Sequence, residues 1–261
     1  MNKRAWLFLA AMLVIALPLA HRAATQTPSS DPPQQSQGGG EPKKNDREAA
    51  RLLKLAAAQG NAEAQSKLGV LYGFGRDGLQ KDDREAARLF KLSASQGNPQ
   101  GQYNLALFTY EGRGGLQKDE REAARLYQLA ATQGDAFAQN NLGAFHGEGL
   151  GGLQKDEREA ARLYALAAAQ GNAIAQFNLG CFYSQAQGGL QKDDREAARL
   201  YKLAADQGHA QAQVNLGVFY WQGLGGLQKN EREAARLFKL AANQGHAEAR
   251  RALKGIAPRA D

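Results

Sequence analysis

The chain has 261 residues, and its 33 lysines and arginines against 26 aspartates and glutamates give a formal net charge of +7. Three of the basic residues lie in the first 25 positions, so the remainder carries 30 basic and 26 acidic residues, or +4, interleaved in sign. This pattern predicts no nucleic-acid surface, because such a surface needs a stripe of one sign. The single cysteine excludes an internal disulfide and a cysteine-based metal site.

Residues 1–24 have the pattern of an export signal. Two basic residues precede an uninterrupted apolar run from Ala5 to Ala20, which is shorter than the roughly 20 residues of a membrane-spanning helix. We expect cleavage near Ala24 and a periplasmic or secreted protein, with a bacterial envelope as the setting. In the alternative, residues 5–20 are retained and anchor the protein in the inner membrane; otherwise the mature protein has no membrane span.

Residues 25–44 are rich in proline, glutamine, serine and glycine. Such a composition buries too little apolar surface to offset the entropy of ordering. We therefore expect a disordered linker between the export signal and the rest of the chain.

One hexapeptide organises residues 45–256. Arg-Glu-Ala-Ala-Arg-Leu recurs unchanged at a constant spacing of 37 residues, with the first arginine at 47, 84, 121, 158, 195 and 232. A fixed period of this length is typical of a solenoid, in which each unit buries its apolar face against the next.

Each copy is predicted to form two helices. In residues 156–192 an aspartate three positions before a glutamate predicts a capping box and a helix start. Gly171 ends that helix, and a second helix begins near Ala173 and stops at the glycine-rich loop around Gly188. We expect about twelve helices in all. The last copy is degenerate, and its polar outer residues are those that a solenoid cap requires; they are Arg250, Arg251 and Lys254. A short tail, residues 257–261, follows.

The pattern Ala-Gln-x-Asn-Leu-Gly-x-Phe-Tyr, a glycine-rich turn, and Glu-Ala-Ala-Arg-Leu-Tyr-x-Leu-Ala-Ala-x-Gln-Gly resembles the Sel1-like repeat, a relative of the tetratricopeptide repeat. The loop departs from the family pattern by one extra glycine. The resemblance implies an all-α fold, a right-handed α/α superhelical solenoid of about six 37-residue helix-turn-helix repeats. Some cysteine-rich relatives are linked to β-lactam binding or hydrolysis, but their paired cysteines are absent here.

The positions that vary between copies lie on one stripe of each second helix. In tetratricopeptide relatives the matching stripe lines a concave groove that holds peptides. The resemblance therefore predicts partner-binding residues, because a few aromatic anchors usually dominate an interface. The candidates are Tyr103, Tyr110, Phe137, Asn140, Ile174, Phe177 and Trp221. The alternative is that several of them are ordinary packing between helices.

An asparagine precedes the leucine of four second helices and forms a second set of candidates. A ladder of amides can hold the backbone of an extended ligand, or it can cap and bridge adjacent repeats. The asparagines are Asn104, Asn141, Asn178 and Asn215.

We predict neither catalytic residues, nor a metal site, nor a cofactor. The histidines are dispersed, the carboxylates serve as helix caps, and no hydrolase or phosphate-binding motif occurs. The expected function is a non-catalytic scaffold that binds a protein or peptide partner in its groove. Two alternatives stay open: a cell-envelope hydrolase acting on cell-wall peptides or related to β-lactams, and a structural spacer without a ligand.

Overall fold

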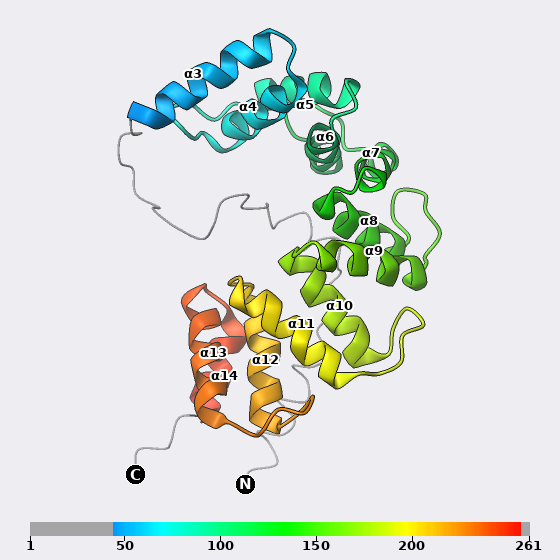
Figure 1. The fold of residues 1–261 in the computed structure, drawn as a ribbon, viewed down its shortest axis with the longest axis vertical. Helices are drawn as coiled ribbons and strands as arrows, with labels where there is room; N and C mark the ends of the chain where they lie inside the picture. Colours follow the sequence, from blue (N-terminus) through cyan, green and yellow to red (C-terminus); the bar gives the residue numbers. More distant parts are fainter. Residues whose placement is uncertain (1–43, 257–261) are drawn as a thin grey trace. The chain divides into compact units, whose positions relative to one another are not determined.

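The computed structural model describes residues 44–256, which form twelve α-helices and no strand. The predicted all-α repeat fold is therefore confirmed (Figure 1). The expected export signal, most of the linker and the tail lie outside the described residues. Within 44–256 no helix is both long enough and apolar enough to cross a membrane. The chain divides after Asp156 into two compact units, called here the N-terminal unit (44–156) and the C-terminal unit (157–256).

The N-terminal unit contains three helix pairs. Each helix packs against the next one along the chain, and α4 also contacts α6, so the pairs stack in sequence order. The helices are α3 (Lys44–Ala58), α4 (Ala62–Phe74), α5 (Asp83–Ser95), α6 (Pro99–Glu111), α7 (Glu120–Thr132) and α8 (Ala136–Glu148).

The C-terminal unit repeats the arrangement with three further pairs, again packed in chain order. In both units the odd-numbered helices carry the Glu-Ala-Ala-Arg motif and are called first helices; the even-numbered ones are called second helices. The helices are α9 (Glu157–Ala169), α10 (Ala173–Gln185), α11 (Asp194–Asp206), α12 (Ala210–Gln222), α13 (Glu231–Asn243) and α14 (Ala247–Ile256).

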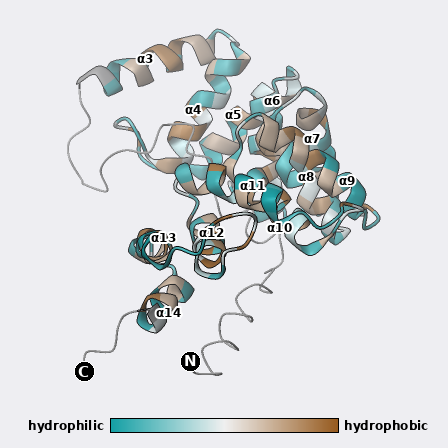
Figure 2. Cartoon of the chain, turned by 60° about the horizontal axis from the view of Figure 1, so that its bottom comes forward, coloured by the Kyte–Doolittle hydropathy of each residue, from teal (hydrophilic) through white to brown (hydrophobic). Residues whose placement is uncertain are grey.

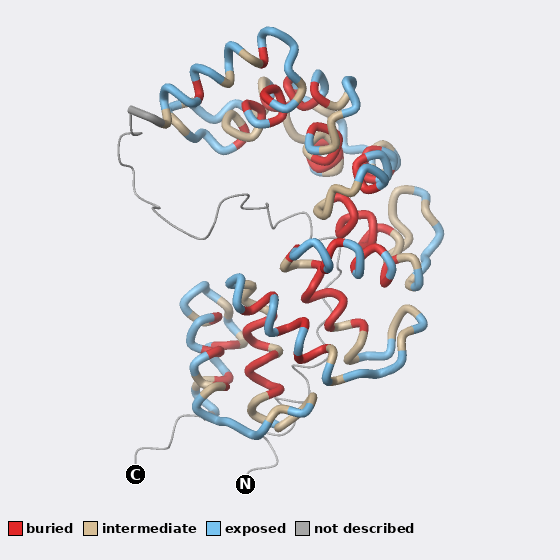
Figure 3. Tube along the Cα trace, in the orientation of Figure 1, coloured by how far each residue is buried: buried red, intermediate tan, exposed pale blue. Residues whose placement is uncertain are grey.

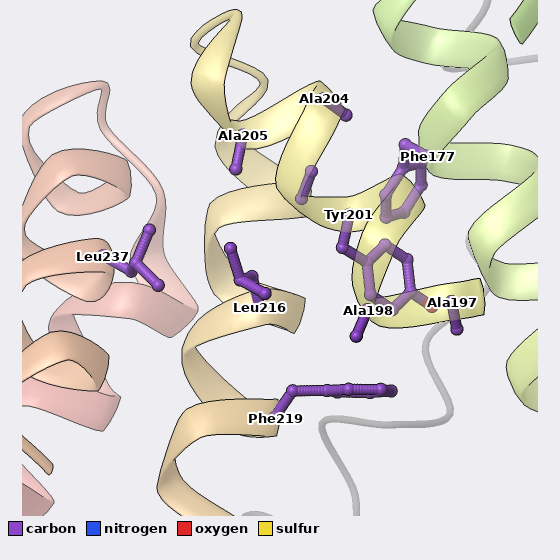
Figure 4. Close-up of a cluster of buried hydrophobic side chains, with 10 residues drawn as sticks. Phe177, Ala197, Ala198, Tyr201, Ala204, Ala205, Leu216, Phe219 and Leu237 are labelled. Carbon is purple, nitrogen blue, oxygen red and sulfur yellow. The ribbon is translucent and has the colours of Figure 1, made fainter. Parts of the chain in front are cut away.

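The core of each unit lies between first and second helices (Figure 3). In the C-terminal unit Tyr201 of α11 packs between Phe177 of α10 and Phe219 of α12, surrounded by alanines and leucines (Figure 4). A glycine makes room for this ring, because a Cβ on Gly180 would lie 2.8 Å from the Tyr201 ring. The two helices therefore cross closely at Gly180, and burial of these large side chains drives the stacking.

The first helices start as the sequence predicts, but only half of the capping box forms. The Asp82 carboxylate accepts hydrogen bonds from the backbone amides of Arg84 and Glu85. The backbone amide of Asp82 instead donates to the carbonyl of Tyr72, in the preceding helix. Glu85 is thereby released and pairs with Arg88 at 2.7 Å. The expectation of a reciprocal glutamate bond was wrong because tertiary structure already satisfies that amide.

Glutamines join consecutive repeats. The Gln207 side-chain amide donates to Gln176 Oε1 at 2.8 Å, and the Gln176 amide donates to the carbonyl of Ala168 at 3.3 Å. The same bridge recurs from Gln244 to Gln213, and from Gln96 to Gln65. Each bridge ties the end of a first helix to the second helix of the preceding repeat. The accepting glutamines, at 65, 176 and 213, are buried, and their pairing fixes the register of the stack, since an unpaired buried amide would cost free energy.

The two ends of the array differ. Leu52 of α3 is 55% exposed, whereas Leu89, at the same place in the next repeat, is 2% exposed because α4 covers it. Apolar residues accordingly colour much of α3 brown in Figure 2. The last helix, α14, instead presents Arg250, Arg251 and Lys254 to solvent, in the manner predicted for a cap.

Candidate partner-binding face

The stripe predicted from the sequence occupies one face of the second helices, and we call these side chains the second-helix face. Burial divides its members. The half-buried residues have surface to offer a partner, whereas those below one tenth exposure lie between helices. The half-buried members are Asn104, Tyr110, Phe137, Ile174, Asn215 and Trp221. The buried members are Tyr103, Asn140, Asn141, Phe177 and Asn178.

In the N-terminal unit the buried members belong to the packing between repeats. Tyr103 is 4% exposed and its ring lies 6.0 Å from that of Tyr127 and 5.8 Å from that of Phe137. Burial raises the pKa of Tyr103 well above its ordinary value. Asn141 forms a hydrogen bond with the tyrosine hydroxyls of both Tyr103 and Tyr127. Asn141 and the two tyrosines therefore hold the repeats together and offer no surface.

Tyr110 and Phe137 sit at the edge of that cluster. The Tyr110 ring packs edge-on against the Phe145 ring, with 5.4 Å between the centroids. The Lys118 ammonium lies 5.3 Å from the centroid of the Tyr110 ring. An ammonium near a ring is attracted to its negative face. Both aromatic side chains are half-buried at this edge. They are therefore held in place and still accessible.

In the C-terminal unit Phe177 is 9% exposed and stacks on the His209 ring at 4.8 Å. Ile174, one turn earlier on α10, is half-buried. Trp221 is also half-buried, at the end of α12, with the Lys229 ammonium 5.8 Å from its ring centroid. Trp221 and Lys229 thus repeat the arrangement of Tyr110 and Lys118 in the other unit.

The asparagine ladder is only partly accessible. Asn104 donates to Ser66 Oγ at 3.4 Å, and Asn215 lies 4.0 Å from Cys181 Sγ while accepting from Gln211 at 3.4 Å. Asn141 and Asn178 are 4% and 3% exposed. Two of the four ladder amides, at 104 and 215, are therefore positioned at the surface.

Sequence comparison did not reveal a polar network that crosses the C-terminal unit. His246 contacts Gln211 Oε1 at 2.7 Å, and Gln211 leads to Asn215 and Cys181. The Tyr201 hydroxyl then lies 3.5 Å from Cys181 Sγ. Because these residues come from several helices, the sequence does not show that they meet. Only the pair Gln211 and Asn215, four residues apart on one helix, could have been predicted to interact.

In the C-terminal unit His209 caps a helix, and His246 belongs to this polar network. His209 Nδ1 accepts from the Ala212 amide at 3.1 Å and caps α12, as Asn172 caps α10. In residues 44–256 no three histidine, cysteine, aspartate or glutamate side chains are grouped so as to hold a metal ion. The carboxylates at the starts of the first helices act as caps or as ion-pair partners.

The stacked helix pairs define an α-helical repeat protein. The Sel1 repeat family matches six consecutive segments, at residues 35–61, 62–98, 99–135, 136–172, 173–209 and 210–246. The chain belongs to the Sel1 repeat family. No curated protein sequence matches it significantly.

Solved structures agree with this assignment. The chain is 33% identical to a Sel1 repeat protein from Oxalobacter formigenes, with a TM-score of 0.69 over 82% of this chain and 83% of that one. It is 28% identical to a protective antigen of uropathogenic Escherichia coli that displays an SLR fold, with a TM-score of 0.66 over 97% of this chain and 50% of that one. A putative Sel1 repeat protein from Klebsiella pneumoniae shares the fold at 19% identity, with a TM-score of 0.52 over 80% of this chain and 99% of that one.

Sel1 repeat proteins are generally non-catalytic scaffolds for protein interactions. The family therefore supports a protein partner for this chain and leaves its identity open.

Proposed function

We propose that the protein is a non-catalytic scaffold whose second-helix face binds an extended segment of a partner protein. One observation carries the proposal. Phe137, Ile174 and Trp221 remain half-buried, whereas the aromatic rings that build the core, such as Tyr127 and Tyr201, are 1% exposed. Large apolar side chains that the fold leaves partly open are the kind that anchor interfaces.

The accessible amides complement these anchors. Asn104 in the N-terminal unit and Asn215 in the C-terminal unit are half-buried and rest on neighbouring side chains. An amide carries both donors and an acceptor, so it can bond the N–H and C=O groups of an extended backbone. The apolar anchors would then select among the partner's side chains, while the amides would bind its main chain. Each unit supplies both components.

The proposed setting is the bacterial envelope, as the apolar run at residues 5–20 suggests. The experiment replaces Phe137 or Trp221 by a photo-crosslinking phenylalanine analogue in the full chain and irradiates it in an envelope extract. We expect one discrete protein adduct from each position. Mass spectrometry of the adduct would identify the partner and the segment bound.

The matched controls carry the same analogue at Leu129 and Leu203. These leucines are each 39% exposed, but they lie on the first helices, away from the proposed face. Equal adducts from both sets of positions would contradict a binding face on the second helices. An absence of adducts from every position would favour the alternative of a spacer without a ligand.

A further inference from the structure

The charges of α14 differ from those of the helices before it. In residues 247–256 three cations accompany one carboxylate, Glu248. By contrast α11 carries Arg195, Arg199 and Lys202 together with three carboxylates. The cations of α14 are Arg250, Arg251 and Lys254.

None of the three α14 cations is neutralised. Arg199 lies 2.6 Å from Glu196, and Lys202 lies 2.8 Å from Asp206. Among the described residues, Arg250, Arg251 and Lys254 have no ion pair and no side-chain hydrogen bond, and all three are exposed. The one carboxylate of α14 is directed to His246, 4.0 Å away. A cluster of one sign therefore remains at the C-terminal end of this unit.

These cations stand where other repeats bury their contact residues. Arg250 occupies the place of the bridging glutamine Gln213, and Arg251 that of the buried Val214. Lys254 occupies the place of Gly217, against which Phe238 packs. A seventh repeat could stack here only by burying three charges, which disfavours a second copy joined end to end. The end surface suits an anionic occupant instead.

We infer that this end of the C-terminal unit binds an acidic segment of a partner protein, whose carboxylates contact Arg250, Arg251 and Lys254. The inference rests on the proposed function and specifies the partner's chemistry. Trp221 packs on the same hydrophobic cluster as Ala252 and Leu253 of α14, so the proposed apolar anchor and the helix that carries the cations share one cluster. Guanidinium groups bind carboxylates through two parallel hydrogen bonds, which adds geometric selectivity to charge attraction.

The test measures fluorescence anisotropy of the full chain with a fluorescein-labelled Glu/Gly/Trp peptide and with a twin in which glutamine replaces each glutamate. We expect the acidic peptide to bind more tightly, and its binding to weaken as salt increases. The triple variant R250Q/R251Q/K254Q should weaken it about tenfold. These side chains are exposed, so the variant should keep the wild-type melting temperature.

The matched control is R195Q/R199Q/K202Q, which removes the same charge from α11. Wild-type affinity in the control, together with loss in the α14 variant, supports the inference. Equal losses in both variants would mean general electrostatic attraction and overturn it, as would tighter binding of a single-stranded DNA with the same charge. The variant W221S separates the two proposals. Loss in W221S but not in the α14 variant leaves the scaffold function standing and removes the acidic partner.

Discussion

The ends of the second helices show how one side chain determines local strain. The C-caps of α4, α6, α8, α10 and α12 adopt a left-handed conformation, and four of them are glycines: Gly75, Gly112, Gly149 and Gly223. The exception is Ala186, which closes α10 with φ of 54°. A Cβ in this conformation approaches the following carbonyl and costs about 1–2 kcal/mol.

We therefore expect A186G to raise the free energy of unfolding by about 0.5–1 kcal/mol, part of the relief being offset by the greater freedom of glycine in the unfolded chain. Urea denaturation followed by circular dichroism measures the change. The reverse substitution G223A provides the matched control and should lower stability by about 1 kcal/mol. A loss of stability in A186G would show that the methyl group makes a compensating contact.

Asp135 at the start of α8 gives the second prediction at this scale. Its carboxylate accepts from the Ala138 amide at 2.8 Å, and burial raises its pKa above the ordinary value despite the backbone donors. A raised folded-state pKa means that its favourable contribution is complete below the unfolded pKa and is lost as pH rises through the folded one. At neutral pH the buried charge is therefore a net cost.

Asparagine keeps the capping acceptor without the charge, as Asn98 and Asn172 do at the same place. We expect D135N to raise the free energy of unfolding at neutral pH by up to about 1 kcal/mol. The gain should shrink as pH falls toward and below the ordinary pKa of aspartate, where the wild-type side chain is also uncharged. A gain that stays constant across a series of denaturation curves from acid to neutral pH would contradict a charge effect.

At the scale of helices, local signals predicted boundaries better than they predicted contacts. Asp193 fixes the start of α11 and Gly171 the end of α9, because caps depend on residues close in sequence. The second-helix stripe was identified by comparison of copies, which does not distinguish a packing difference from a binding difference. Phe177 and Tyr103 vary between copies yet are buried by the next repeat, so their exposure depends on a partner helix more than 20 residues away.

Local sequence signals did not predict the glutamine bridges between helices either, since each bridge joins residues 31 positions apart. We expect Q176A to lower the free energy of unfolding by about 1–3 kcal/mol, because it removes two hydrogen bonds, one from Gln207 and one to the Ala168 carbonyl, which keeps the bond from the Gly171 amide. Q207A should cost less, since Gln207 is exposed. A double-mutant cycle measures the coupling, and we expect at least about 0.5 kcal/mol. Additive effects of the two single mutations would show that the bridge does not contribute to the free energy of unfolding.

At the scale of the molecule, the period of 37 residues determined the fold because every repeat solves the same packing problem with its neighbour. Burial in such an array depends on position as well as on residue type. Leu52 and Leu89 occupy the same place in the repeat, and within residues 44–256 only Leu89 has a preceding second helix to cover it. The same residue type therefore has two energetic roles in one chain.

The pair gives a direct test of stabilisation by stacking. We expect L89A to lower the free energy of unfolding by about 2–4 kcal/mol, because it leaves a cavity among Ala57, Ala64 and Leu68. We expect L52A to cost less than about 1 kcal/mol, since half of that side chain is already in water. Equal costs in thermal and urea denaturation would mean that Leu52 is covered in the folded protein. In that case the first helix has a partner of its own, and the array has no open N-terminal end.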